Sequence, residues 1–167
     1  LLMTPALALF YGGMVRKKNV LSTLMHSLAA IPIVSVVWAA CGYSLAFGPS
    51  HSGLIGTLGS VGLGDLLTGA HGSVPTLAFC AFQMMFAVIT PALISGAFAE
   101  RMRFSAYVVF IVLWSLLVYV PVAHWVWAEE GWLAKLGALD FAGGAVVHLT
   151  AGASALVCAL KNGRRLK

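Results

Sequence analysis

His148 is the residue whose type and surroundings point most clearly to chemistry. It lies within the apolar segment 137–155, which reads GALDFAGGAVVHLTAGASA and contains one other ionisable residue, Asp140. A charged side chain in the middle of a membrane costs a few kcal/mol or more, so ionisable residues at that depth usually serve a function. We therefore treat His148 as a candidate functional residue.

Asp140 stands at the start of this segment, where the N-cap of a helix is expected. A carboxylate at that position accepts hydrogen bonds from the free N–H groups of the first turn, and the helix dipole favours its charge. Direct binding of a cation is the alternative role. His148 follows eight residues later, ~12 Å deeper and roughly 80° around the helix, so a simple ion pair between the two is not expected.

Three aromatic residues are further candidates, although their types alone leave their roles open. Phe82 and Phe86 are four residues apart and share one face of a predicted helix. On an apolar helix such a pair is typical of lipid contact or core packing. Trp127 follows Trp125 at the predicted outer end of another helix, where aromatic residues commonly form an interfacial belt.

The residue spacing disfavours a metal centre, and with it a metal-dependent membrane enzyme. No two of the five histidines are three or four residues apart, and no carboxylate lies within a predicted span. Cys41, Cys80 and Cys158 are widely separated within spans and are expected to be buried, inert thiols. We expect no metal, no cofactor and no enzymatic activity.

Membrane helices must position these residues, because the composition is that of an integral membrane protein. The sequence is 60% hydrophobic and 9% charged, whereas charged residues make up about a quarter of a soluble domain. Four uncharged runs reach the length of about 20 residues that spans a bilayer. We predict an all-α polytopic membrane protein with one membrane domain over 1–167, an outer loop at 48–74, and helices at about 1–15 (truncated), 20–47, 75–98, 104–127 and 140–161.

The basic residues predict the orientation of these helices. Nine of the ten fall in alternate segments between the helices, and therefore on one side of the membrane. By the positive-inside rule this side is the cytoplasm. The net charge of +5 thus reflects membrane topology and not nucleic-acid binding. The nine residues are Arg16, Lys17, Lys18, Arg101, Arg103, Lys161, Arg164, Arg165 and Lys167.

Small residues surround His148 in the sequence. Gly143 and Gly144 precede it, and the run Ala151–Ala155 follows it. Such residues let another helix approach closely. We therefore expect the helix 140–161 to be packed inside a bundle, with His148 buried, electrically neutral and at a depth similar to that of Phe86.

Several stretches of the chain together resemble the ammonium transporter (Amt) family. They occur in the family's order and are FYGGMVRKKNVL at 10–21, GYSLAFG at 42–48, AERMRFS at 99–105, GALDFAGG at 137–144 and VVH at 146–148. The family fold has eleven membrane helices, arranged as two inverted five-helix halves and a last helix. The resemblance implies that this chain forms the first half, with about five of those helices.

The resemblance also implies roles for the candidate residues. Trp127 matches a tryptophan of the outer vestibule and Phe86 a phenylalanine at the top of the pore, both of which help to recruit the cation. Phe82 matches a second phenylalanine of the vestibule. His148 matches the first of two pore histidines, and Asp140 an aspartate that holds the pore mouth. The second histidine, the second gating phenylalanine and a serine of the recruitment site belong to the other half of the family fold.

The implied function is transport of ammonium or ammonia, in which the cation loses a proton and passes a phenylalanine gate and the pore histidine. An ammonium sensor, with the same membrane fold joined to a signalling domain, is the alternative. Trp127 together with Asp140 favours the Amt branch over the Rh branch. The family further implies a homotrimer in the plasma or inner membrane and a PII signalling protein as a partner on the cytoplasmic face.

Overall fold

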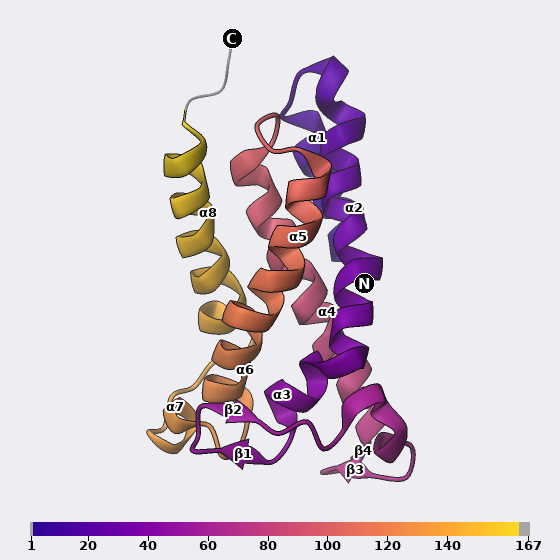
Figure 1. Cartoon of the computed structure of the whole chain (residues 1–167), viewed down its shortest axis with the longest axis vertical. Helices are drawn as coiled ribbons and strands as arrows, with labels where there is room; N and C mark the ends of the chain where they lie inside the picture. Colours follow the sequence, from indigo (N-terminus) through magenta and orange to yellow (C-terminus); the bar gives the residue numbers. More distant parts are fainter. Residues whose placement is uncertain (1, 164–167) are drawn as a thin grey trace.

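The computed structural model describes residues 2–163, with the backbone alone for Asp65. Its helices run side by side along the longest axis of the molecule (Figure 1). Arg164, Arg165, Lys167 and Leu1, which figured in the predicted topology and first helix, lie outside the described residues. Within the described part, four helical stretches are long and apolar enough to cross a membrane, and they are Lys17–Phe47, Thr76–Phe98, Phe104–Lys135 and Gly144–Asn162.

The first two predicted helices form an antiparallel pair. Helix α1 (Met3–Gly13) packs against α2 (Val20–Val37), and the short helix η1 (Lys17–Asn19) lies in the turn between them. The chain then continues without a break through the π-helical segment η2 (Trp38–Gly42) into α3 (Tyr43–Phe47). Together these elements correspond to the helix expected over 20–47.

The segment 48–74, expected to be an outer loop, contains regular structure. Strand β1 (Ser50–His51) pairs antiparallel with β2 (Ile55–Gly56), and β3 (Ala70–His71) pairs antiparallel with β4 (Val74–Pro75). The 3₁₀ segment η3 (Val61–Leu67) lies between the two hairpins. The hairpins cover one end of the bundle (Figure 1).

His124 fixes the first hairpin to the helices, a role that its sequence context did not predict. Its fully buried imidazole lies 2.9 Å from the carbonyl oxygen of Ala46 through Nδ1 and 2.8 Å from the hydroxyl of Ser50 through Nε2. Because a carbonyl only accepts, Nδ1 carries the proton and Nε2 accepts the bond from Ser50. A buried histidine with both nitrogens bonded is a structural residue.

The remaining helices complete the bundle. Helix α4 (Thr76–Ser95) ends in the 3₁₀ turn η4 (Gly96–Phe98) and is followed by α5 (Phe104–Trp114), the π segment η5 (Ser115–Tyr119) and α6 (Val120–Trp127). The short α7 (Trp132–Lys135) precedes the π segment η6 (Gly144–Leu149) and α8 (Thr150–Asn162). Large buried side chains fill the core between α2, α4, α5 and η5, among them Trp38, Ile94, Phe98, Tyr107, Ile111 and Tyr119.

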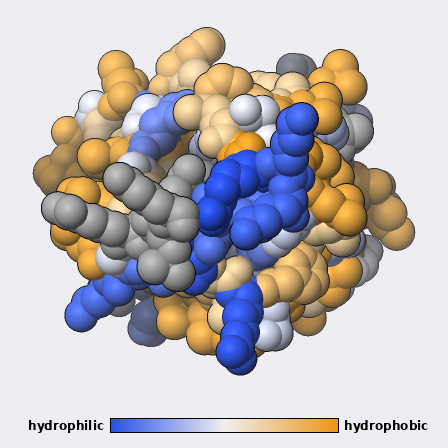
Figure 2. All heavy atoms as spheres, turned by 90° about the horizontal axis from the view of Figure 1, so that it is seen from above, coloured by the Kyte–Doolittle hydropathy of each residue, from blue (hydrophilic) through white to orange (hydrophobic). Residues whose placement is uncertain are grey.

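The two ends of the bundle differ in character. One end carries the turns 14–19 and 99–103 and the end of α8, while the hairpins and α7 lie at the other (Figure 1). Viewed onto the first end, hydrophilic side chains gather on the surface (Figure 2). Its exposed basic residues are Arg16, Lys17, Lys18, Arg103 and Lys161. This end is the one that the positive-inside rule assigns to the cytoplasm.

Glu100 joins the two turns at this end. Its Oε1 accepts hydrogen bonds from Asn19 Nδ2 at 2.6 Å, Arg16 Nε at 3.1 Å and the backbone N–H of Arg16 at 3.2 Å. The side chain is only 5% exposed, and the backbone has a positive φ of 67°. The hydrogen bonds from Asn19 and then from Arg16 outweigh the opposing effect of desolvation and lower the pKa of Glu100 from 4.5 to about 2.

The last helix departs from expectation in two ways. Its regular turns begin at Gly144 and not at residue 140. Helix α8 contacts α4 and η4, but its opposite face is open, with Leu160 73% exposed. The prediction that it is packed inside a bundle is wrong for this chain, because no described element covers that face.

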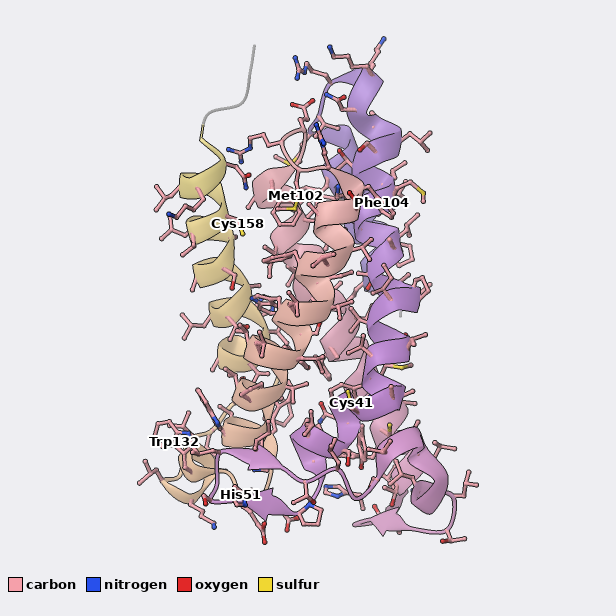
Figure 3. All side chains as sticks on the ribbon, in the orientation of Figure 1. Cys41, His51, Met102, Phe104, Trp132 and Cys158 are labelled. Carbon is pink, nitrogen blue, oxygen red and sulfur yellow. The ribbon has the colours of Figure 1, made fainter. Side chains whose placement is uncertain are left out.

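The three cysteines are free thiols. Cys41 lies in η2 and Cys158 in α8, toward opposite ends of the bundle (Figure 3). Cys80, on α4, is buried. Its backbone carbonyl accepts a hydrogen bond from the Trp38 indole at 3.2 Å, which joins α4 to η2.

Candidate functional site

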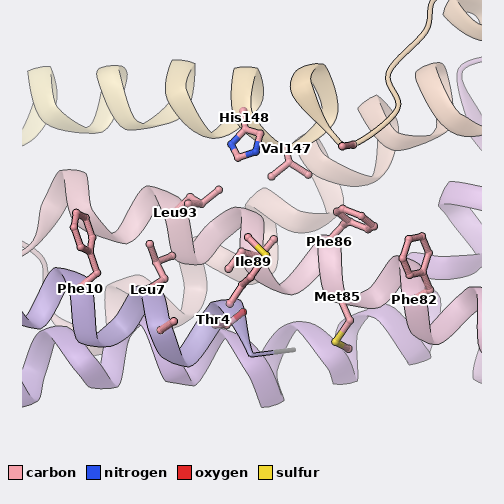
Figure 4. A pocket seen from close by; sticks show the side chains of 13 residues that line it. Thr4, Leu7, Phe10, Phe82, Met85, Phe86, Ile89, Leu93, Val147 and His148 are labelled. Carbon is pink, nitrogen blue, oxygen red and sulfur yellow. The ribbon is translucent and has the colours of Figure 1, made fainter.

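An apolar cavity of about 730 Å³ lies between α1, α4 and the segment that leads into α8 (Figure 4). Among the described residues that line it, His148 is the only ionisable one. The cavity therefore combines an apolar wall with one group that can exchange a proton. The lining residues are Met3, Thr4, Ala6, Leu7, Phe10, Phe82, Met85, Phe86, Ile89, Leu93, Ala142, Val147 and His148.

Helix α4 contributes one complete face to this cavity. Phe82, Met85, Phe86, Ile89 and Leu93 recur at spacings of three and four residues, which places them on one side of a helix. Of these five residues, only the two phenylalanines were predicted as site residues from the sequence. The same helical spacing would have identified the other three as neighbours on that face.

Three aromatic rings form a continuous series at the end of the cavity nearer the hairpins. The ring centroids of Phe82 and Phe86 are 5.1 Å apart with an interplanar angle of 84°, and those of Phe86 and Trp127 are 5.5 Å apart at 63°. These edge-to-face arrangements are favourable for aromatic pairs. Phe82 is 58% exposed, whereas Phe86 and Trp127 are partly buried. We call these three residues the aromatic series.

Asp140 organises the start of the helix that carries His148. Its Oδ1 accepts hydrogen bonds from the N–H groups of Gly143 and Gly144, at 2.9 and 2.6 Å. Its Oδ2 accepts from those of Ala145 and Val146, at 3.0 and 2.9 Å. The carboxylate thus binds four free N–H groups at the helix start, although Asp140 precedes the N-cap residue, Gly143, by three positions.

Gly143 determines how the chain enters this helix. Its φ is +87°, in the left-handed region, and a Cβ there would lie 2.6 Å from Cγ2 of Val147. Its carbonyl oxygen accepts hydrogen bonds from the N–H groups of Val147 and His148, both at 2.9 Å. The bond to His148 spans five residues, as in a π-helix. Gly143 and the π segment η6 together set where His148 enters the cavity.

Trp127 is joined to the same segment. Its indole Nε1–H donates a hydrogen bond of 2.8 Å to the backbone carbonyl of Asp140. Asp140 therefore positions the helix through its side chain and the indole through its backbone. Hydrogen bonds of Asp140 therefore link Trp127 to the start of the helix that carries His148.

His148 is less enclosed than expected. Its side chain lines the cavity, with the ring directed toward α4 (Figure 4), and no described residue hydrogen-bonds its ring nitrogens. The residue is exposed. The expectation of a buried imidazole is therefore wrong for this chain, because the open face of the last helix leaves that side of the ring uncovered. Phe86 and His148 nevertheless line the same cavity. Among the described residues there is no group of three or more side chains that could hold a metal ion.

The fold and this site define a polytopic membrane protein with an apolar, histidine-bearing cavity between its helices. The profile of the Ammonium Transporter Family matches residues 1–167. The chain belongs to the ammonium transporter family. This confirms the family resemblance and the predicted fold class.

Named relatives and solved structures agree with this assignment. The chain is 58% identical over 167 residues to the ammonium transporter of Bacillus subtilis, covering 98% of this chain and 41% of the relative. A crystal structure of Mep2 from Candida albicans superposes with a TM-score of 0.90 at 42% identity, covering 98% of this chain and 36% of that one. A structure described as a sensor Amt protein superposes with a TM-score of 0.87 at 30% identity, covering 98% and 43%.

The chain spans about two fifths of the length of the curated relatives that it matches. These relatives are named as transporters and not as enzymes, in agreement with the prediction that the protein is not an enzyme. With its apolar helices, family membership indicates a multi-pass membrane protein.

Proposed function

We propose that the protein transports ammonium or ammonia across a cell membrane. The observation that carries the proposal is the aromatic series, which leads to a cavity where His148 is the only ionisable lining residue described. Family membership and the names of the relatives support ammonium as the substrate.

Recruitment of the cation is assigned to the aromatic series. An aromatic face attracts a cation by ~0.5–2 kcal/mol, and by more where water is excluded. The ring of Phe82 is the most exposed of the three. It contacts Phe86, which in turn contacts Trp127. A cation that meets these rings is held at the entrance of the cavity without a full countercharge.

Selection occurs at Phe86, where the path becomes apolar. A cation that loses its water in an apolar space has a large free-energy cost. Ammonium avoids that cost by leaving a proton behind and crossing as ammonia, which potassium cannot do. His148 is the proton acceptor or relay, because a neutral imidazole accepts with one nitrogen and donates with the other. Asp140 stabilises this arrangement structurally and does not bind the substrate.

The assembly of the whole transporter is part of the same proposal. The open face beside His148 is covered by the second half of the family fold, which supplies the other wall of the pore. We further propose a homotrimer in the plasma or inner membrane, with a PII signalling protein on the cytoplasmic face. Support for a partner at that end comes from its exposed basic residues, including Lys17, Lys18 and Arg103.

The decisive experiment is uptake of ammonium or methylammonium by His148→Ala in a full-length carrier. The full-length carrier is a transporter in which this chain is joined to the remaining part of the family fold, taken for example from the Bacillus subtilis relative. His51→Ala, an exposed histidine of β1, is the matched control. We expect His148→Ala to lose uptake or its selectivity over potassium, and unchanged uptake and selectivity would contradict the role of His148.

An ammonium sensor is the second candidate function. It is favoured by the similarity to the sensor Amt protein, which extends over 98% of this chain. In a sensor the aromatic series and cavity would bind ammonium without sustained transport. Saturable ammonium binding without uptake into proteoliposomes would support the sensor and exclude transport.

A further inference from the structure

The segment η3, between the two hairpins, carries apolar side chains on opposite sides. Leu66 is 6% exposed and belongs to the hydrophobic core, and the partly buried Leu63 packs against that core. Val61 and Leu67 belong to the same short segment and are 54% and 72% exposed. An element that is apolar all round is normally covered on each side, by protein or by lipid. The outward side of η3 is therefore a candidate interaction surface.

The chain around η3 is also apolar. Leu58, which precedes Val61, is 57% exposed. Asp65 is the only charged residue within 52–70. Exposed apolar side chains that gather on one surface mark a contact with protein or with a membrane, whereas a loop surrounded by water is mostly polar. We call residues 58–67 the apolar loop segment.

The contacts of η3 determine its depth in the membrane. It packs against η2, α3 and α4, and η2 lies within the membrane span Lys17–Phe47. At ~1.5 Å per residue, η2 extends from ~32 to ~38 Å along the helix from Lys17. The hydrocarbon core is ~30 Å thick, and the bilayer with its headgroups ~40–45 Å. With Lys17 among the cytoplasmic headgroups, η2 and the adjoining η3 lie where the hydrocarbon core meets the headgroups of the opposite leaflet.

The position of η3 around the bundle separates it from the candidate site. In Figure 1 it is the magenta segment beside β3 and β4, and α8 with its open face lies on the opposite side of the bundle. None of Leu58, Val61 and Leu67 lines the cavity that contains His148. We therefore expect lipid at this surface, and not the part of the family fold that covers α8.

We propose that the apolar loop segment is an interfacial anchor, which inserts Leu58, Val61 and Leu67 among the lipids of the outer leaflet. These side chains contact the acyl chains just below the headgroups. Because the segment contains no basic residue, the contact does not select anionic headgroups. The segment lies between the β1–β2 and β3–β4 hairpins, and it holds both of them at the membrane surface. The inference rests on the membrane topology and not on the proposed transport function.

An added tryptophan reports whether the segment touches lipid. Leu67→Trp and Val61→Trp are prepared in the full-length carrier and reconstituted into phosphatidylcholine bilayers. The emission in excess of that of the parent protein is quenched by lipids brominated at different depths of the acyl chain and, separately, by acrylamide in the water. His51→Trp is the control, because His51 is exposed and its strand β1 lies beyond the ends of α3 and α6 (Figure 1).

The two loop variants and the control should respond in opposite ways. We expect lipids brominated near the headgroup to remove most of the added emission of Leu67→Trp and Val61→Trp, since an interfacial segment inserts ~5–10 Å into the boundary between headgroups and acyl chains. Bromine near the methyl end of the chain should have less effect. Acrylamide should remove mainly the added emission of His51→Trp.

Two results would overturn the proposal. One is quenching of Leu67→Trp and Val61→Trp by acrylamide as strong as that of His51→Trp, which would place the segment in water. The other is quenching by neither agent, which would show that protein covers the segment, either a second copy or the other half of the family fold. Failure of the transport proposal is distinguishable, because it appears as lost ammonium uptake without a change in quenching by lipid.

Discussion

The ring of Phe86 on α4 lies 5.5 Å from the indole of Trp127 at the end of α6, with the ring planes 63° apart. This contact joins two helices that are distant in sequence and places both rings at the entrance of the cavity. In the proposed transport function a cation there meets both π systems, and we expect Trp127 to contribute to affinity and Phe86 to selection.

Replacement of Trp127 by leucine tests affinity. We expect Trp127→Leu to raise the KM for ammonium about two- to thirtyfold, the equivalent of ~0.5–2 kcal/mol of lost cation–π attraction, with little change in maximal rate. Trp125→Leu is the control, because Trp125 contacts Trp132 and the carbonyl of Leu54 and is not part of the aromatic series. Equal KM values for the two variants would argue against recruitment by Trp127.

Replacement of Phe86 tests selection. Phe86→Ala removes the ring at the point where the path becomes apolar, so water and hydrated cations enter the cavity. We expect potassium to compete with ammonium at least about tenfold more effectively, measured as inhibition of uptake. Phe82→Ala, at the more exposed end of the aromatic series, is expected to weaken affinity while retaining selectivity. Unchanged selectivity in a Phe86→Ala carrier would contradict the proposal that Phe86 is a gate.

Asp140→Asn tests the hydrogen bonds at the helix start. In Asp140 each carboxylate oxygen accepts hydrogen bonds from two backbone N–H groups. The asparagine amide keeps one such oxygen and replaces the other with an NH₂ group, which cannot accept. We expect a loss of about 2 kcal/mol in stability, seen as a lower Tm of the full-length carrier. Glu129→Gln, an exposed carboxylate, should leave the Tm unchanged. Equal Tm values for the two variants would show that Asp140 does not stabilise the helix.

Gly143→Ala tests the backbone conformation that leads to His148. The added Cβ would lie 2.6 Å from Val147 Cγ2, on a backbone with φ of +87°. We expect destabilisation of about 1–3 kcal/mol together with reduced uptake, because η6 must shift. Gly13→Ala is the control, since an added Cβ there meets no described atom within 4 Å. Equal behaviour of the two variants would contradict the argument from strain.

Glu100 gives a pH-dependent prediction. Because its pKa is lowered from 4.5 to about 2 in the folded protein, the ionised carboxylate stabilises the fold above about pH 4.5. That stabilisation disappears as the pH falls from 4.5 toward 2. We expect Glu100→Gln to have a lower Tm than the parent at pH 7 and the difference to shrink below pH 4.5. A difference independent of pH would show that the charge of Glu100 is not involved.

The fold class was predictable because hydropathy and one-sided basic residues are properties of local sequence. Length and composition are enough to recognise spans such as Thr76–Phe98. The open face of α8 was not predictable, because a stripe of small residues shows that a helix can be approached and not which chain approaches it. The hydrogen bonds of His124 were also missed, since its partners Ala46 and Ser50 are remote in sequence.

The site was predictable residue by residue but not as an arrangement. Asp140 was identified as a helix cap from its position before an apolar run. Asp140 binds four N–H groups although it precedes the N-cap by three residues, and this depends on the left-handed conformation of Gly143 and on the π segment η6. The 3.6-residue periodicity of an α-helix predicts neither feature. The bond from Trp127 to the Asp140 carbonyl likewise depends on the fold of 128–143.

That bond has a consequence for which solutes the entrance rejects. The indole N–H is the single hydrogen-bond donor of a tryptophan side chain, and in Trp127 the backbone carbonyl of Asp140 occupies it. The ring therefore presents an approaching molecule with π surface and no polar group. Urea and other small neutral amides must give up hydrogen bonds to water at such a surface and receive none in return. In the proposed transporter we therefore expect the Trp127 ring to favour cations over uncharged polar solutes.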